Sequence, residues 1–147
     1  MRVIIGTDHG GYSQKEQLLA ALRDAGYEVE DMGTHSAEST DYAEYAVKVG
    51  RAVQQDPNAR GILLCRSGEG MEIAANKLKG IRAALVWRPD IAAETRRDND
   101  SNILVLPADF VAEHDMLAIA RSFLDTDFSG EERHQRRIDQ IKALETE

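Results

Sequence analysis

The chain has 147 residues, the size of one domain, and we expect a single domain over residues 1–147. Its 26 acidic and 18 basic residues give a net charge of −8, which argues against a general nucleic-acid binder, because such proteins neutralise phosphates with basic side chains. The one cysteine excludes an internal disulfide, and no apolar run is long enough to span a bilayer. The N-terminus does not resemble a signal peptide, so we expect a cytoplasmic protein without membrane partners.

Short apolar runs alternate with helical patterns along the first half of the chain. Residues 3–5 form a β-branched run, which predicts a strand. Ser13 and Glu16 have the spacing of a capping box for a helix that Gly26 ends, and a second short strand follows over 27–31. The next helix has apolar side chains four residues apart, namely Tyr45, Val49 and Val53.

The second half of the chain continues this alternation. We expect its elements in the order strand 61–65, helix 71–77, strand 83–86, strand 103–106, helix 116–124 and charged helix 131–147. Strands that alternate with helices imply a parallel sheet with helices on both faces. The predicted fold is α/β, a Rossmann-like three-layer sandwich with a five-stranded parallel sheet and a C-terminal helix.

Ligands in such sheets bind at the carboxyl ends of strands, which directs attention first to residues 7–11. There, Asp8 and His9 place a carboxylate beside an imidazole, a pair suited to proton transfer or anion binding. A helix cap next to a surface histidine explains the same residues equally well.

The loop Cys65–Gly70 follows a buried strand and precedes a helix. Its glycines allow backbone N–H groups to converge on a phosphate or a developing oxyanion, although no Gly-Lys-Ser/Thr follows as in a P-loop. The adjacent helix end could lower the pKa of Cys65. The commoner explanation for a lone cysteine at a strand end is a buried structural role.

Three further features are less specific. Arg133 and Arg137 are one helical turn apart and suit a phosphate clamp, but a solvated charged face is the commoner explanation. The polar run 97–102 is typical of a turn, and Tyr42 is either a ligand contact or a helix start. The four histidines are scattered without zinc-like spacing, so we expect neither a metal nor a cofactor.

Taken together, six segments resemble the ribose-5-phosphate isomerase B family, which also includes galactose-6-phosphate and other sugar-phosphate isomerases. In chain order they are residues 6–11, 38–42, 61–77, 80–84, 99–102 and 133–137, and residues 61–77 are the most specific. The resemblance implies metal-independent aldose–ketose isomerisation through a cis-enediolate, most often of ribose 5-phosphate to ribulose 5-phosphate. It also implies a homodimer or homotetramer whose sites take residues from two subunits.

Individual roles carry over by position. Cys65 would be the base that moves a proton between C1 and C2, and Ser67 would support proton handling at the sugar oxygens. The backbone of Gly68, Glu69 and Gly70 would form the anion hole for the enediolate. The substrate-binding residues expected besides these are Asp8, His9, Tyr42, Asn99, Arg133 and Arg137.

The sequence departs from the family pattern at four positions. Arg66 replaces a common glycine, Glu69 occupies a position that is usually apolar or neutral, and Asp109 falls where many members have an arginine. A carboxylate at position 69 would oppose a thiolate unless it points outward or pairs with Arg66. Most important, Asp98 stands where the family usually has the histidine that opens the sugar ring.

The substitution at position 98 leaves the substrate open, because an aspartate does not readily donate a proton at neutral pH. Either Asp98 or His9 opens the ring of ribose 5-phosphate, or the substrate needs no opening. A tetrose or tetrulose 4-phosphate is of the second kind, because its O4 is esterified. A hexose 6-phosphate and a non-catalytic sugar-phosphate-binding companion subunit are the remaining alternatives.

Overall fold

The computed structural model describes all residues, 1–147, and contains one parallel sheet with the strand order β2-β1-β3-β5-β4. The strands are β1 (Arg2–Thr7), β2 (Glu28–Asp31), β3 (Arg60–Cys65), β4 (Ala83–Leu85) and β5 (Ile103–Pro107). A short 3-10 helix, η1 (His9–Gly11), leads into α1 (Tyr12–Asp24), and α2 (Tyr42–Gln55) and α3 (Glu69–Ala75) follow in turn. The remaining helices are α4 (Pro89–Asn99), α5 (Glu113–Leu124) and α6 (Glu132–Leu144). The predicted α/β architecture is confirmed.

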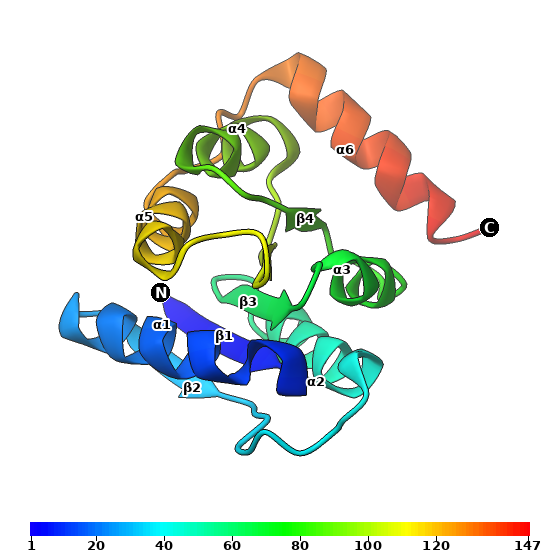
Figure 1. Cartoon of the computed structure of the whole chain (residues 1–147). Helices are drawn as coiled ribbons and strands as arrows, with labels where there is room; N and C mark the ends of the chain where they lie inside the picture. Colours follow the sequence, from blue (N-terminus) through cyan, green and yellow to red (C-terminus); the bar gives the residue numbers. More distant parts are fainter.

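Helices cover both faces of the sheet because neighbouring strand residues point to opposite faces. Ile5 packs in one apolar cluster with residues of α1 and α5, while Ile4 packs in a second cluster with residues of α2 and α3. Both side chains are fully buried, as expected for continuous β-branched runs inside a parallel sheet. Figure 1 shows the resulting layers, with α1 and α5 on one side of the strands and α2 and α3 on the other.

Two local predictions were wrong. Ser13 is not a helix cap: it lies inside α1, whose N-cap is Gly11, and the capping carboxylate is Asp8, which accepts the Gly10 N–H of η1 at 2.9 Å. The polar run 97–102 is not simply a turn, because residues 97–99 form the last turn of α4. That helix buries only Ala92, Thr95 and Arg96, so its sequence lacks a clear apolar stripe.

The C-terminal helix α6 lies apart from the layers (Figure 1). Ile138 is buried against the rest of the chain, but Ile141 and Leu144 expose 47% and 62% of their surface. The last two side chains line a groove of about 820 Å³ between α6, α3 and the edge strand β4. None of the helices is both long and apolar enough to cross a bilayer.

A buried ion pair fixes the loop after β2. The Lys15 side chain on α1 is fully buried, and its Nζ donates to both carboxylate oxygens of Asp31 and to the carbonyl oxygen of Thr34, each at 2.8 Å. Asp31 also accepts the Gly33 N–H at 2.9 Å. Because both ions are removed from bulk water, loss of one leaves the other uncompensated.

Lys15→Met is therefore expected to lower the free energy of unfolding by about 3 kcal/mol, measured by urea denaturation. The matched control is Lys48→Met, which removes an exposed lysine paired with Glu44 at 3.0 Å. We expect the control to lose less than about 1 kcal/mol, because exposed pairs contribute little. Equal losses in the two variants would contradict a special role for the buried pair.

Candidate active site

The carboxyl ends of β1 and β3 adjoin at the point where the sheet changes its direction of winding. From β1 the chain proceeds outward to β2 on one side, and it then returns to β3 on the other side. Such switch points are where open α/β sheets bind ligands. Here residues 8–11 follow β1 and residues 66–70 follow β3, and we call these two segments together the switch point.

Cys65 is the last residue of β3 and exposes 5% of its surface. Burial raises the pKa of its thiol above the ordinary value, and the negative charge of Asp8 raises it further. Backbone N–H groups of Met71, Gly68 and Ser67 face the sulfur and act in the opposite direction. The sequence suggested that the helix end lowers the pKa of Cys65. The N–H groups do act in that direction, but the net pKa is raised because desolvation is the larger effect.

Tight packing positions the loop that carries these N–H groups. Gly68 has a φ of 81°, a conformation that favours glycine, and a Cβ there would lie 2.4 Å from Leu85. The ring of Tyr42 covers Gly70, where a Cβ would lie 2.8 Å from it. Ser67 accepts the Glu69 N–H through its Oγ at 3.4 Å, which leaves its own O–H free to donate.

Asp8 and His9 approach the same place from β1. Asp8 is 7% exposed, and its carboxylate is held by the Gly10 N–H. The His9 Nδ1 lies 3.1 Å from the backbone N of Thr40 and 3.2 Å from its carbonyl oxygen, so this nitrogen is occupied by backbone. His9 Nε2 is then the ring nitrogen left for a ligand.

The unusual charged residues around Cys65 are separated in space. Glu69 is exposed on the first turn of α3 and has no ion-pair partner. Arg66 instead pairs with Asp109, with Nη1 and Oδ2 3.8 Å apart. Two of the departures from the family pattern, at 66 and 109, thus contact each other.

The structure does not bring the remaining predicted residues to Cys65. Helix α4 runs back against the strands, so Asp98 and Asn99 at its end lie at the amino edge of the sheet, and Arg133 and Arg137 lie nearby on α6. The six residues of β3 separate the two edges by roughly 17 Å. No arginine side chain spans that distance, so one chain holds two halves of the predicted site.

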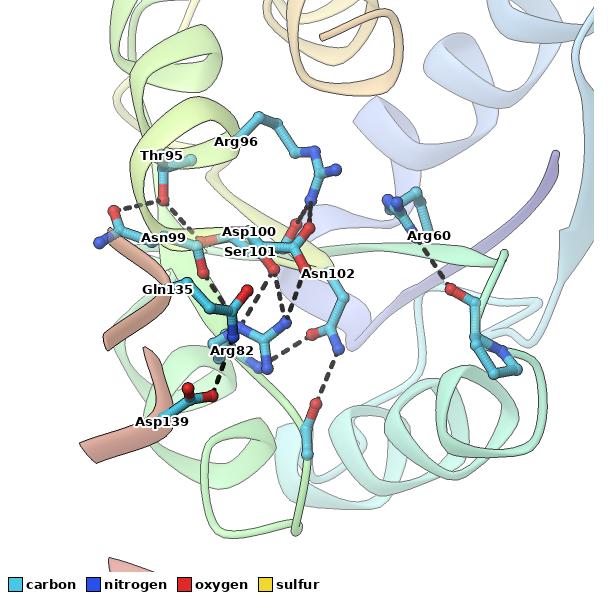
Figure 2. Close-up of polar contacts among 12 residues, drawn as sticks. Arg60, Arg82, Thr95, Arg96, Asn99, Asp100, Ser101, Asn102, Gln135 and Asp139 are labelled. Atoms are coloured by element: carbon cyan, nitrogen blue, oxygen red, sulfur yellow. Dashed lines mark hydrogen bonds and ion pairs between the residues drawn. The ribbon is translucent and has the colours of Figure 1, made fainter. Parts of the chain in front are cut away.

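A polar network fixes this second half (Figure 2). Arg82 donates to the carbonyl oxygens of Asn99 and Asp100 at 3.0 and 2.9 Å, and Arg96, 2% exposed, donates to the Asp100 carboxylate at 2.9 Å. Asp100 has a φ of 47°, a rare value for a residue with a side chain, which the two arginines hold in place. These hydrogen bonds hold the end of α4 in a fixed position.

Two contacts made by residues of the candidate site were missed in the sequence. His134 on α6 is buried, and its Nε2 lies 3.4 Å from Oδ1 of Asp98. Thr40 holds His9, as described above. His134 lies between the two arginines that drew attention, but no local pattern pairs it with a residue 36 positions earlier.

Comparison with known proteins shows which family the chain and its fold resemble. Residues 3–141 match the family described as Ribose/Galactose Isomerase. The ribose-5-phosphate isomerase B of Escherichia coli is 39% identical over 98% of this chain and 96% of its own length. The Clostridium thermocellum ribose-5-phosphate isomerase B structure superposes with a TM-score of 0.95, at 41% identity over 99% of this chain and 98% of that one.

A third relative has a ligand. The Mycoplasma genitalium ribose-5-phosphate isomerase B structure, with bound ribulose 5-phosphate, has a TM-score of 0.94 at 36% identity and covers 99% of this chain and 97% of that one. The sequence resemblance, the fold and the near-complete coverage lead to one conclusion: this chain belongs to the ribose/galactose isomerase family.

Proposed function

We propose that this protein interconverts ribose 5-phosphate and ribulose 5-phosphate without a metal, with Cys65 as the base. The observation that carries the proposal is the buried Cys65 thiol at the sheet's switch point, faced by three backbone N–H groups. Relatives that cover nearly the whole chain are ribose-5-phosphate isomerases, and one was solved with ribulose 5-phosphate bound. Sugar phosphates are metabolites of the cell interior, so we place the activity in the cytoplasm.

The chemistry follows from the acidity of a carbon next to a carbonyl. The Cys65 thiolate removes the proton from C2 of the open aldose, a C1–C2 double bond forms, and the carbonyl oxygen O1 becomes negative. The thiol returns the proton to C1 while the proton on O2 passes to O1, which leaves the carbonyl at C2. The charge on O1 requires preorganised donors, and we assign this role to the backbone of residues 68–70.

Polar groups around Cys65 serve the sugar oxygens and the phosphate. The free O–H of Ser67 is the donor for the proton shift between O1 and O2. Asp8 is held rigidly beside Cys65 and accepts a sugar hydroxyl, and the Nε2 of His9 donates to a hydroxyl or to the phosphate. Tyr42 packs on the loop and limits the space above Gly70.

The second half of the site comes from a second copy of the chain. Asp98, Asn99, Arg133 and Arg137 lie too far from Cys65 of their own chain, and the groove lined by Ile141 and Leu144 leaves apolar surface uncovered. A homodimer that pairs the amino edge of one chain with the switch point of the other unites base and phosphate clamp. Two guanidiniums one turn apart then bind the phosphate in a bidentate manner.

Asp98 is the proposed ring-opening residue, and it also supports a second candidate function. Its carboxylate can remove the O1 proton of a cyclic aldose, but an ionised carboxylate only accepts hydrogen bonds and has no proton to deliver to the ring oxygen. A tetrose 4-phosphate cannot form a furanose ring and needs no such donor. Isomerisation of a four-carbon sugar phosphate is therefore the second candidate.

Cys65→Ala is expected to lower kcat for ribose 5-phosphate by at least about 10²-fold, the contribution of a general base, while ribulose 5-phosphate still binds in calorimetry. In the wild type, kcat/KM is expected to rise with pH on the alkaline side, because the raised pKa of Cys65 leaves little thiolate near neutral pH. If Cys65→Ala retains most of kcat, a carboxylate such as Glu69 or Glu72 is the base.

Mixing inactive variants tests the shared site. Cys65→Ala and Arg137→Gln homodimers are each expected to be nearly inactive, and their subunits, unfolded together and refolded at equal amounts, to recover about a quarter of the wild-type activity. The reason is that half of the dimers are mixed and each mixed dimer has one intact site. Absence of recovery, or a monomer in light scattering at assay concentration, would refute the arrangement.

Asp98→His separates the two candidate substrates. We expect it to raise kcat/KM for ribose 5-phosphate by about tenfold or more, because general acid–base catalysis typically accelerates a reaction by about 10²–10⁴-fold. A tetrose 4-phosphate, already open, is expected to change little. Steady-state kinetics on both compounds decide: a wild type that strongly prefers ribose 5-phosphate and gains nothing from histidine shows that Asp98 is a competent replacement.

A further inference from the structure

Arg66 lies across the switch point. It directly follows Cys65, the last residue of β3, and its side chain reaches Gly10 in the segment after β1. A Cβ built on Gly10 would come within 2.7 Å of its Cγ and 3.4 Å of its Nε, so the arginine stem rests on the backbone of Gly10. Gly10 is next to His9, whose Nε2 is the ring nitrogen left for a ligand.

The guanidinium of Arg66 is held in position but makes no side-chain hydrogen bond. Its one ion-pair partner, Asp109, lies 3.8 Å away, and no hydrogen bond joins the two side chains. The side chain of Arg66 is 69% exposed and that of Asp109 is 43% exposed, so their attraction is weakened by solvent. The loop after β3 and the loop after β5 are joined without this ion pair, because the Asp109 N–H donates to the Arg66 carbonyl oxygen at 2.9 Å. The five guanidinium N–H groups therefore remain available.

Charge balance at the switch point requires such a cation. Three carboxylates belong to or adjoin the switch point, namely Asp8 after β1, Glu69 on the first turn of α3, and Asp109, whose N–H donates to the Arg66 carbonyl oxygen, and a phosphate ester is itself doubly negative. In the same chain, Arg133 and Arg137 are at the opposite edge of the sheet. Arg66 is the guanidinium that this chain itself places between the segments after β1 and β3.

We propose that Arg66 is a phosphate-binding residue of the site, and that Asp109 holds its guanidinium over the switch point until the substrate phosphate takes the place of the carboxylate. This inference rests on the proposed sugar-phosphate isomerase function and adds a cation from the same chain as Cys65. Removal of Asp109 then takes away a competitor of the phosphate, whereas removal of Arg66 takes away its partner. The two variants are therefore expected to act in opposite directions.

The test compares Arg66→Gln, Arg66→Lys and Asp109→Asn with the wild type in two measurements. The first is binding of inorganic phosphate, by calorimetry, and the second is KM and kcat for ribose 5-phosphate. Arg66→Gln is expected to weaken phosphate binding and raise KM by about tenfold or more, the loss of a charged hydrogen-bonding group, with kcat nearly unchanged. Arg66→Lys is expected to restore part of the binding, and Asp109→Asn to bind phosphate as tightly as the wild type or more tightly.

The matched control is Arg88→Gln, which removes an exposed guanidinium paired with Asp90 at 2.7 Å and is expected to change neither measurement. The proposal is overturned if Arg66→Gln binds phosphate like the wild type. It is also overturned if Asp109→Asn weakens phosphate binding as much as Arg66→Gln does. That result is expected if the Arg66–Asp109 ion pair only holds the two loops together. Inactivity of the wild type on ribose 5-phosphate would contradict the proposed function. Phosphate binding does not need turnover, so the calorimetry would still show whether Arg66 binds phosphate.

Discussion

The common direction of the five strands is the constraint on which the rest of this structure depends. Because all strands are parallel, each helix must return to the amino edge before the next strand begins. Groups that follow strands, such as Cys65 and Asp8, therefore gather at one edge, and groups at helix ends, such as Asn99, gather at the other. A site that uses both kinds of group is divided by the length of a strand, and this division is the reason for proposing that a second chain completes it.

Burial of Cys65, the proposed base, has opposing effects on its thiol. Cys65 is buried at the end of a central strand, and this placement protects the thiol while making its ionised form less favourable. The backbone N–H groups that face the sulfur offset part of this effect. Gly68 belongs both to the N–H groups that face the sulfur and to the proposed anion hole, so in the proposed mechanism one loop moderates the charge of the base and of the intermediate.

Much of the fold could be predicted from the sequence because its signals are local. The run at 61–65 is continuous and apolar, and it forms β3 as expected. Helix α4 was missed because it buries few apolar side chains and ends in a polar run. Spacing drew attention to the loop after Cys65 and the family resemblance supplied the expected roles there, whereas the contacts of His134 with Asp98 and of Arg66 with Asp109 were not predicted. These pairs join distant segments, and no periodicity within either segment reports on its partner.

Helix α6 has a consequence for how ligand and assembly influence each other. It carries the proposed phosphate clamp, yet its own chain holds it mainly through His134, Ile138 and a hydrogen bond from the Gly80 N–H to Glu145. In the proposed dimer, a phosphate bound between α6 of one chain and the switch point of the other stabilises the assembled form over the separated chains by mass action. By reciprocity, the free energy of association contributes to substrate affinity. Metabolite concentration and oligomeric state are then coupled variables of one equilibrium.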